Sequence, residues 1–251
     1  MDSQAKIEAG LPNLTVMNAD STQFPPQLRA IPSLNRSSRS LHFAGNLSLL
    51  ELPAVGFCGS RKSSEKGMEA VRDCCEQAAR SRIVVVSGNA KGIDFAAHFT
   101  ALAAGGSTIL VLPEGIRNFR VRKDMRTVWD WGKALVVSQF EPDASWTVFR
   151  AMERNDLIIG LSRAMVVVEA GEAGGTVSAG KATLKAGKPL YVAVYENMPV
   201  NAPGNDLLLQ LGGKRLSRSR ASGRANLGGL FGEVSVPQLA QKAIDPQLAL
   251  L

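Results

Sequence analysis

Short apolar segments that do not alternate with polar residues recur along the middle of the chain and predict buried strands. Six such segments lie at 54–58, 82–87, 107–113, 133–140, 164–170 and 189–195. Stretches with apolar residues at helical spacing are found between them, at 65–81, 92–104, 125–131, 146–160 and 176–186. Strands that are apolar on both faces and alternate with amphipathic helices are typical of a parallel sheet covered on both sides. The pattern therefore predicts an α/β fold with a doubly wound, mainly parallel sheet.

The two ends of the chain differ from this middle part. Residues 1–40 are polar and interrupted by prolines, which predicts an N-terminal arm or small cap outside the packed layers. Residues 41–211 carry the alternating pattern and form the expected main domain, whereas residues 212–251 begin with a Gly/Ser-rich segment and end in a short further element. We expect a basic C-terminal tail, because the charged residues between 212 and 229 are Lys214, Arg215, Arg218, Arg220 and Arg224.

The charge balance favours a polyanionic partner. The chain has 29 Lys and Arg against 22 Asp and Glu, a net charge of +7. A second concentration of cations, "IRNFRVRKDMR" at 116–126, surrounds Asp124 with five basic side chains. Both basic stretches suit a nucleic acid, although each taken alone also fits a solvated surface.

Cysteine, histidine and hydropathy patterns exclude several other classes. The three cysteines, Cys58, Cys74 and Cys75, are odd in number and include an adjacent pair, which fits a reducing compartment better than a disulfide framework. With two histidines, His42 and His98, and no Cys-x-x-Cys pair, no metal site is expected. The polar N-terminus and the lack of a long apolar run predict neither a signal peptide nor a membrane span. We expect a cytoplasmic protein that needs no metal or cofactor.

Glycines, small hydroxyls and cations follow the predicted strands at their carboxyl ends, where open α/β sheets bind ligands. The segments are "GSRKSS" at 59–64, "SGNAKGID" at 87–94, "PEG" at 113–115 and "GEAGGTVSAG" at 171–180. Glycine lets a ligand approach backbone amides closely, and helix N-termini favour anions. Ser60, Ser87 and Thr176 add hydroxyl donors, and Arg61 and Lys91 add cations. Several such loops at one sheet edge predict a phosphate site, whereas one loop alone fits an ordinary turn.

Two further pairs of polar residues lie near these loops. Arg154 and Asn155 precede an apolar helical run, and Arg154 either pairs with Glu169 or points into the predicted pocket. Asp94 lies in the first turn of a helix, where a carboxylate is stabilising, and His98 is placed to hydrogen-bond to it. No serine or cysteine nucleophile is placed beside this His–Asp pair, so we expect it to be structural.

In their order and spacing, "GSRKSS", "VVVSGNAKGIDFAAHFTALAAGGSTILVL" and "ERNDLIIGLSRAMVVVEAGEAGGT" resemble the DprA/Smf family of DNA-processing proteins. The likeness covers about residues 24–195. It implies a Rossmann-like domain that binds single-stranded DNA in a basic pocket at the strand ends, passes it to a recombinase and usually forms a homodimer. The DNA- or phosphate-contact candidates are Gly59, Ser60, Arg61, Ser87, Gly88, Lys91, Gly92, Arg154, Asn155, Gly175 and Thr176.

The chain departs from the pattern of this family at several points. Basic residues at 117–126 replace a tyrosine-proline pair and an asparagine, and Asp156 replaces an arginine. No winged-helix domain is expected after the main domain. Aromatic residues make up 6% of the chain, and Phe95, Phe99 and Trp129 are expected in the core, which leaves few platforms for stacking bases.

Two other functions remain open. The "GGT" of 174–176 resembles cytokinin-activating phosphoribohydrolases, which would make the protein a nucleotide N-glycosidic hydrolase. The glutamate expected three residues later is Ala179 here, which leaves Glu169 and Glu172 as the available acids. The third reading is a sensor of a nucleotide-derived signal in phage defence. Ligand size separates these functions, because only a DNA-binding protein needs a strand of minimum length.

Overall fold

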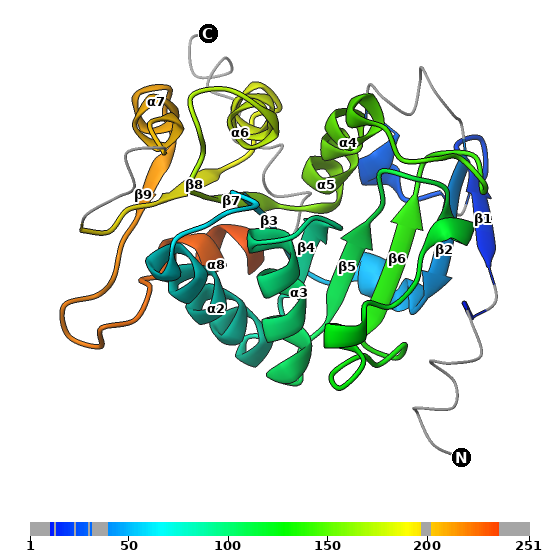
Figure 1. The fold of residues 1–251 in the computed structure, drawn as a ribbon, viewed down its shortest axis with the longest axis horizontal. Coiled ribbons are helices and arrows are strands. Elements are labelled where there is room, and N and C mark those ends of the chain that lie inside the picture. The colour runs from blue at the N-terminus through cyan, green and yellow to red at the C-terminus, as the bar shows by residue number, and fades with distance from the viewer. Residues whose placement is uncertain are drawn as a thin grey trace, which may run out of the picture.

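The sheet of this protein has nine strands and helices on both faces (Figure 1). The computed structural model describes residues 11–12, 14–22, 24–29, 31, 40–196 and 202–235. The strands follow the order β1-β2-β6-β5-β4-β3-β7-β8-β9. Their bounds are β1 (Thr15–Asn18), β2 (Ser40–Gly45), β3 (Ala54–Gly59), β4 (Val84–Gly88), β5 (Thr108–Val111), β6 (Ala134–Ser138), β7 (Ala164–Val168), β8 (Leu190–Ala193) and β9 (Lys214–Leu216).

The strands from β6 to β9 are all parallel, and β1 and β2 join β6 as an antiparallel edge. The chain builds the sheet from β3 through β4 and β5 to β6, then returns to the other side of β3 for β7, β8 and β9. This reversal creates a topological switch point between β3 and β7, beyond whose carboxyl ends ligands bind in open α/β sheets. The predicted doubly wound α/β class and its six core strands are confirmed.

Two helical layers cover the sheet. The α-helices are α2 (Glu65–Arg80), α3 (Ile93–Ala103), α4 (Val148–Glu153), α5 (Asn155–Leu161), α6 (Gly175–Lys185), α7 (Gly204–Gln210) and α8 (Gly228–Ser235). Short 3-10 turns are η1 (Pro26–Leu28), η2 (Leu47–Glu51), η3 (Ile116–Asn118) and η4 (Lys123–Met125). Along β4, Val84 and Val86 pack with α5 and α6, whereas Val85 packs with α2 and α3. Successive strand residues face opposite sides, so an apolar run without alternation fills both cores.

The described part of the N-terminal segment packs against the sheet, unlike the expected arm outside the packed layers. β1 pairs with β2, and Phe24, Leu28 and Ile31 are buried in the core on the α5 side. Ile31 lies so close to Gly160 of α5 that a Cβ at this glycine would overlap it. The proline-rich composition suppresses a long helix but not burial, because three large apolar side chains are enough to hold the segment.

The C-terminal basic segment is likewise part of the domain and not a tail. Lys214 begins the edge strand β9 and pairs with Glu233 of α8. Arg218 pairs with Glu69 of α2 at 3.0 Å. Arg224 completes the docking onto α2 through carboxylates described below. The acids that pair with these cations lie on α2 and α8. The sequence of the basic segment taken alone therefore does not reveal the ion pairs. Residues 236–251 of the predicted short C-terminal element lie outside the described residues.

Two predicted helices differ in the structure. The helix expected at 125–131 is replaced by η4 and turns, since Trp129 and Trp131 pack edge to face, 5.1 Å between ring centroids, from an irregular chain. The helix expected at 146–160 begins only at Val148, after the N-cap Thr147, and is interrupted at Arg154. Across the described ranges, the structure contains no helix with the length and apolar character that a membrane span requires.

Candidate nucleic-acid interface

The loop after β3 is held in a fixed conformation by its backbone. The Ser60 amide donates to Val168 O at 3.2 Å, and Ser60 O accepts from the Ile93 amide at 3.2 Å. The Ser60 hydroxyl accepts from the Lys62 amide at 3.0 Å. The loop therefore joins the ends of β3, β7 and α3, and it leaves Arg61 and Lys62 exposed at its tip. The predicted Ser60 orders this tip.

The loop after β4 contacts the first loop directly. Gly92 has φ +77°, and a Cβ there would overlap Ser60 O, so both its conformation and its surroundings require glycine. Asp94, in the first turn of α3, accepts from the Ala90 amide at 3.2 Å. This bond fixes the turn that carries the exposed Lys91. The break from strand into "SGNAKG" thus places a lysine beside the "GSRKSS" loop.

Arg154 lies between these loops and α5. Its side chain is 9% exposed and pairs with Asp94, Nη2 to Oδ2, at 3.4 Å. The guanidinium covers Gly88, where a Cβ would overlap it. Among the described residues, Arg154 Nε has no hydrogen-bond partner. Arg154 therefore pairs with Asp94 and not with Glu169, and it keeps an unused buried donor.

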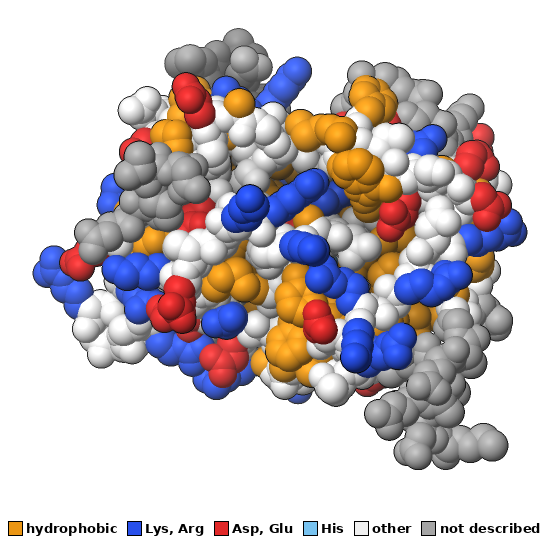
Figure 2. Space-filling view, viewed as in Figure 1, with side chains coloured by type: hydrophobic (Ala, Val, Ile, Leu, Met, Phe, Trp, Pro, Cys, Tyr) orange, Lys and Arg blue, Asp and Glu red, His pale blue; other side chains and the backbone are white. Residues whose placement is uncertain are grey.

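Arg154 and the tips of the two loops line one open cavity of about 410 Å³ beyond the carboxyl ends of β3 and β4. Its lining is Arg61, Lys62, Asn89, Ala90, Lys91, Pro113, Trp146, Ala151 and Arg154. Figure 2 shows Lys and Arg side chains gathered on this face of the molecule. Four cations from three loops converge without a carboxylate in the lining, so the cavity attracts an anion.

Exposed apolar side chains stand next to this cavity, and the sequence reasoning missed them. Trp146 is 47% exposed and Phe149 is 75% exposed, and Val148 and Met152 are exposed as well. Figure 2 shows hydrophobic side chains at the surface around α4, close to the basic ones. Their signal in the sequence is the three-residue spacing of Trp146, Phe149 and Met152 in a segment that also contains Arg150. Two large exposed aromatic rings beside a cationic cavity offer a stacking surface.

Glu169 directly follows β7 at the switch point and holds the "GSRKSS" loop in place. It is buried, has φ +54°, and accepts from the hydroxyls of Ser63, Ser64 and Tyr195 and from the Ser64 amide. Burial would raise the pKa of Glu169, but these hydrogen bonds together hold it below its usual value. The carboxylate is occupied by four donors, so its role is to position the "GSRKSS" loop.

The remaining predicted contacts take other places. Ser87 is fully buried and donates to Phe57 O at 2.7 Å, which corrects its expected role as a phosphate donor. Gly59 packs against Val168 O and Ile93 at the strand crossing. Asn155, Gly175 and Thr176 are half-buried and do not belong to the cavity lining.

His98 is also structural, and it bonds to partners other than the expected Asp94. Its Nε2 lies 2.8 Å from Gly88 O, and its Nδ1 lies 2.6 Å from Thr108 Oγ1. Burial is the largest influence and lowers the pKa of His98 to about 4, although the bond to Gly88 and the charge of Asp94 act against it. A neutral ring therefore supports the strand beneath Arg154.

We expect stability to depend on pH through His98. The folded pKa lies below the ordinary 6.5, so the stabilisation is complete above about pH 6.5 and is lost as the pH falls toward 4. The loss is roughly 2–3 kcal/mol. NMR titration of the folded protein should show His98 neutral at pH 5.5. A titration midpoint near 6.5 would contradict the assignment.

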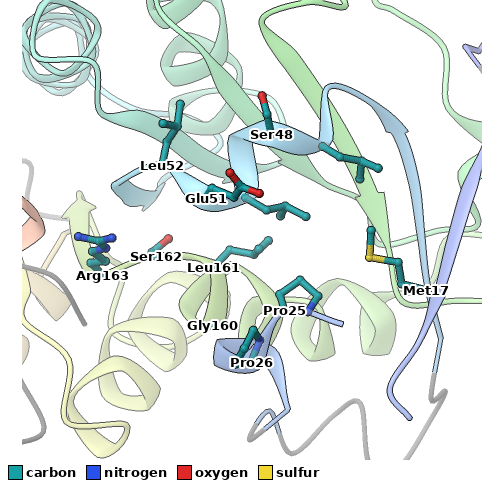
Figure 3. A pocket seen from close by; sticks show the side chains of 12 residues that line it. Met17, Pro25, Pro26, Ser48, Glu51, Leu52, Gly160, Leu161, Ser162 and Arg163 are labelled. Atoms are coloured by element: carbon teal, nitrogen blue, oxygen red, sulfur yellow. The ribbon is translucent and has the colours of Figure 1, made fainter. Parts of the chain in front are cut away.

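A larger cavity, of about 520 Å³, opens at the opposite edge of the sheet (Figure 3). It lies at the amino ends of β3 and β7, between η1, η2 and the end of α5. Its lining mixes apolar residues, Met17, Leu50, Leu52 and Leu161 among them, with the charged residues Glu51 and Arg163. It lacks the converging cations of the smaller cavity, so size alone does not make it the candidate site.

Comparisons with known proteins place this fold in a family. The fold and cavity define a doubly wound α/β protein with cations gathered beyond its strand ends. A family model described as "DNA recombination-mediator protein A" matches residues 15–222, and the chain belongs to this family. DNA processing protein DprA of Streptococcus pneumoniae is 34% identical over 175 residues, 69% of this chain and 62% of that protein. This chain therefore spans less than two thirds of the length of that relative.

Solved structures show the same fold. The X-ray structure of DNA processing protein A from Streptococcus pneumoniae has a TM-score of 0.71 and 28% identity, covering 86% of this chain and 75% of that chain. DNA processing protein A from Helicobacter pylori, solved for its single-stranded DNA binding mode, has a TM-score of 0.68 and 23% identity, covering 81% and 91%. The predicted resemblance to the DprA/Smf family is confirmed.

Proposed function

We propose that this chain binds single-stranded DNA, holding the phosphate backbone in the cationic cavity without catalysing a reaction. Arg154 carries the proposal: a buried guanidinium whose Nε has no partner among the described residues faces a cavity that also holds Arg61, Lys62 and Lys91. A buried donor without a partner is costly, and a bound phosphate would satisfy it. The Helicobacter pylori relative, whose fold is shared, binds single-stranded DNA.

The aromatic rim favours a strand over a mononucleotide. Trp146 lines the cavity, and Phe149 lies three residues further along the same segment. Phosphates in the cavity would place the attached bases outside it, against exposed rings. Base stacking on aromatic rings tolerates any sequence, which suits a DNA-processing protein. In contrast, the Glu169 carboxylate is engaged by four donors, and Glu172, the other acid open to a hydrolase, is exposed and outside the cavity lining.

The test is the binding of a fluorescent oligonucleotide by fluorescence anisotropy over a salt series. We expect the dissociation constant to fall as the strand lengthens and the logarithm of affinity to decline linearly with the logarithm of salt. An unlabelled strand should displace the probe, whereas a mononucleotide should not. Full displacement by a mononucleotide, or the absence of binding, would refute the proposal and favour the sensor or hydrolase.

The aromatic rim gives a separate prediction. Replacing Trp146 and Phe149 with alanine should weaken binding of single-stranded DNA at least about 30-fold, because base stacking contributes about 1–3 kcal/mol per base and two rings are removed. The thermal unfolding midpoint should change little, since both side chains are largely exposed. The control is Leu52→Ala/Leu211→Ala, which removes two exposed apolar side chains that do not line the cationic cavity. Equal losses in both variants would contradict a stacking role.

Delivery of the strand to a recombinase and action as a homodimer complete the proposal. The family description, a recombination mediator, supports the first part. Both are tested together by sedimentation of the chain with and without single-stranded DNA and a bacterial recombinase.

A further inference from the structure

The basic loop at residues 116–126 begins at the wall of the cationic cavity. Pro113 lines that cavity, and the loop starts three residues later, with η3. The Gly115 amide donates to Ala144 O at 2.8 Å, and the Arg117 amide donates to Pro142 O at 3.0 Å. The loop is thereby joined to the segment that leads into Trp146. It is a direct continuation of the candidate interface.

The loop then runs beside α3, where it meets two aromatic rings. Arg122 lies over the Phe95 ring, with Cζ 4.7 Å from the ring centroid. Phe95 stacks on Phe99 one turn later, with 5.9 Å between centroids. Both rings are half-buried, so part of each remains accessible. Since Phe95 is only four residues after Lys91, this aromatic pair extends from the cavity along the flank of α3.

Packing and hydrogen bonds hold the backbone that carries the cations of this loop. Phe119 packs against Trp129, with 5.7 Å between ring centroids. Arg120 Nη1 donates to Arg117 O at 2.8 Å and to Phe119 O at 2.7 Å. The basic side chains therefore project from an ordered backbone and lose little backbone entropy when they bind.

Most charge of this loop is not neutralised by the protein. Arg117 pairs with Asp143 at 2.8 Å, in an exposed ion pair. Lys123 and Arg126 are exposed and make no ion pair with another described residue. Asp124 is the one acid within the loop.

The other basic stretch of the chain differs in this respect. Lys214 and Arg218 are paired with carboxylates. Arg224 contacts both Asp73 and Glu76 at 2.5 Å. Cations that already hold acids have less charge to offer a phosphate. Arg215 and Arg220 of this stretch are exposed and have no ion pair with another described residue, but it is the 116–126 loop that continues directly from the wall of the cationic cavity.

We propose that this loop and the Phe95–Phe99 pair form a second contact for the same single strand, guiding it out of the cavity along α3. This inference rests on the proposed function. Cations beside accessible aromatic rings fit a single strand, which offers phosphates and unpaired bases together. The contact requires a strand longer than the cavity itself holds.

Length therefore separates the second contact from the first. The variant Lys123→Ala/Arg126→Ala is compared with Lys133→Ala/Lys185→Ala, which removes the same charge at the opposite sheet edge. Binding is measured with oligothymidine of about six and about 20 nucleotides. We expect the loop variant to bind the short strand like wild type and the long strand about tenfold more weakly. Its salt slope for the long strand should fall by about 1.4, or 0.7 for each lost phosphate contact.

The other possible outcomes distinguish failure of the second contact from failure of the proposed function. Unchanged long-strand affinity in the loop variant would overturn the second contact, as would equal weakening of both strands or an equal effect of the control pair. In these cases wild type still binds both strands and the cavity proposal stands. If wild type binds neither strand, the proposed function fails, and the second contact fails with it.

Discussion

The double variant Arg61→Ala/Lys91→Ala is expected to lose at least about 100-fold in affinity for single-stranded DNA. Both side chains line the cavity and are exposed, and they come from the two loops that Gly92 and Ser60 hold together. Hydrogen bonds to charged groups contribute about 1.5–3 kcal/mol each, so the loss of two exceeds a factor of 100. The salt slope should fall by about 1.4.

The Arg61→Ala/Lys91→Ala variant is expected to lose DNA binding without losing stability. Neither side chain has a hydrogen bond or ion pair with another described residue, so the midpoint of thermal unfolding should stay near that of wild type. Lys133→Ala/Lys185→Ala is again the matched control for net charge. Wild-type affinity in Arg61→Ala/Lys91→Ala, together with unchanged folding, would move the DNA contact away from the strand-end cavity.

The largest effect on stability is expected at Arg154. Replacing it with methionine leaves the Asp94 carboxylate, 8% exposed, without its cation. Removing one partner of a buried ion pair costs about 3–5 kcal/mol, since the remaining charge is neither solvated nor compensated. Urea unfolding at pH 7 should show this loss as a lower midpoint with an unchanged m-value.

Two further variants test the cause of this loss. Asp94→Asn/Arg154→Met should recover most of the stability, because the asparagine oxygen still accepts from the Ala90 amide and no charge remains buried. Arg117→Met breaks an exposed pair with Asp143 and should cost no more than about 1 kcal/mol. A loss at Arg154 as small as that at Arg117 would show that the buried pair is not a major stabilising contact.

Local sequence patterns were sufficient to predict the strands of the central sheet. The runs around Val85 and Val166 were predicted as strands because both faces of such a strand are buried, which leaves an unbroken apolar signature. The glycine-rich loops were predicted at the strand ends for a local reason as well, since a positive φ such as that of Gly92 favours glycine. Arg61 and Lys91 were assigned to one site from topology alone, and the structure places both in one cavity.

Contacts between residues distant in the chain could not be predicted from local sequence patterns. Ser87 resembles a ligand-binding hydroxyl in the sequence, yet its side chain points into the sheet toward Phe57. The direction of a side chain at a strand end depends on the register of the neighbouring strand. The predicted alternatives for Arg154 were a pair with Glu169 or a place in the pocket, whereas the structure pairs it with Asp94 and places it in the cavity lining. This pairing depends on where the start of α5 lies relative to the first turn of α3, which the spacing of residues does not specify.

The sequence by itself determined the alternation of strands and helices, the family motifs and the cationic loops at one sheet edge, since these follow from residue periodicity and backbone conformation over a few positions. Only the tertiary structure decided which charges remain open. It neutralised Arg218 and Arg224 with acids of α2, left Lys123 and Arg126 exposed, and brought Trp146 to the cavity. Charge pairing and exposure depend on contacts between residues distant in the chain, which composition and spacing do not encode.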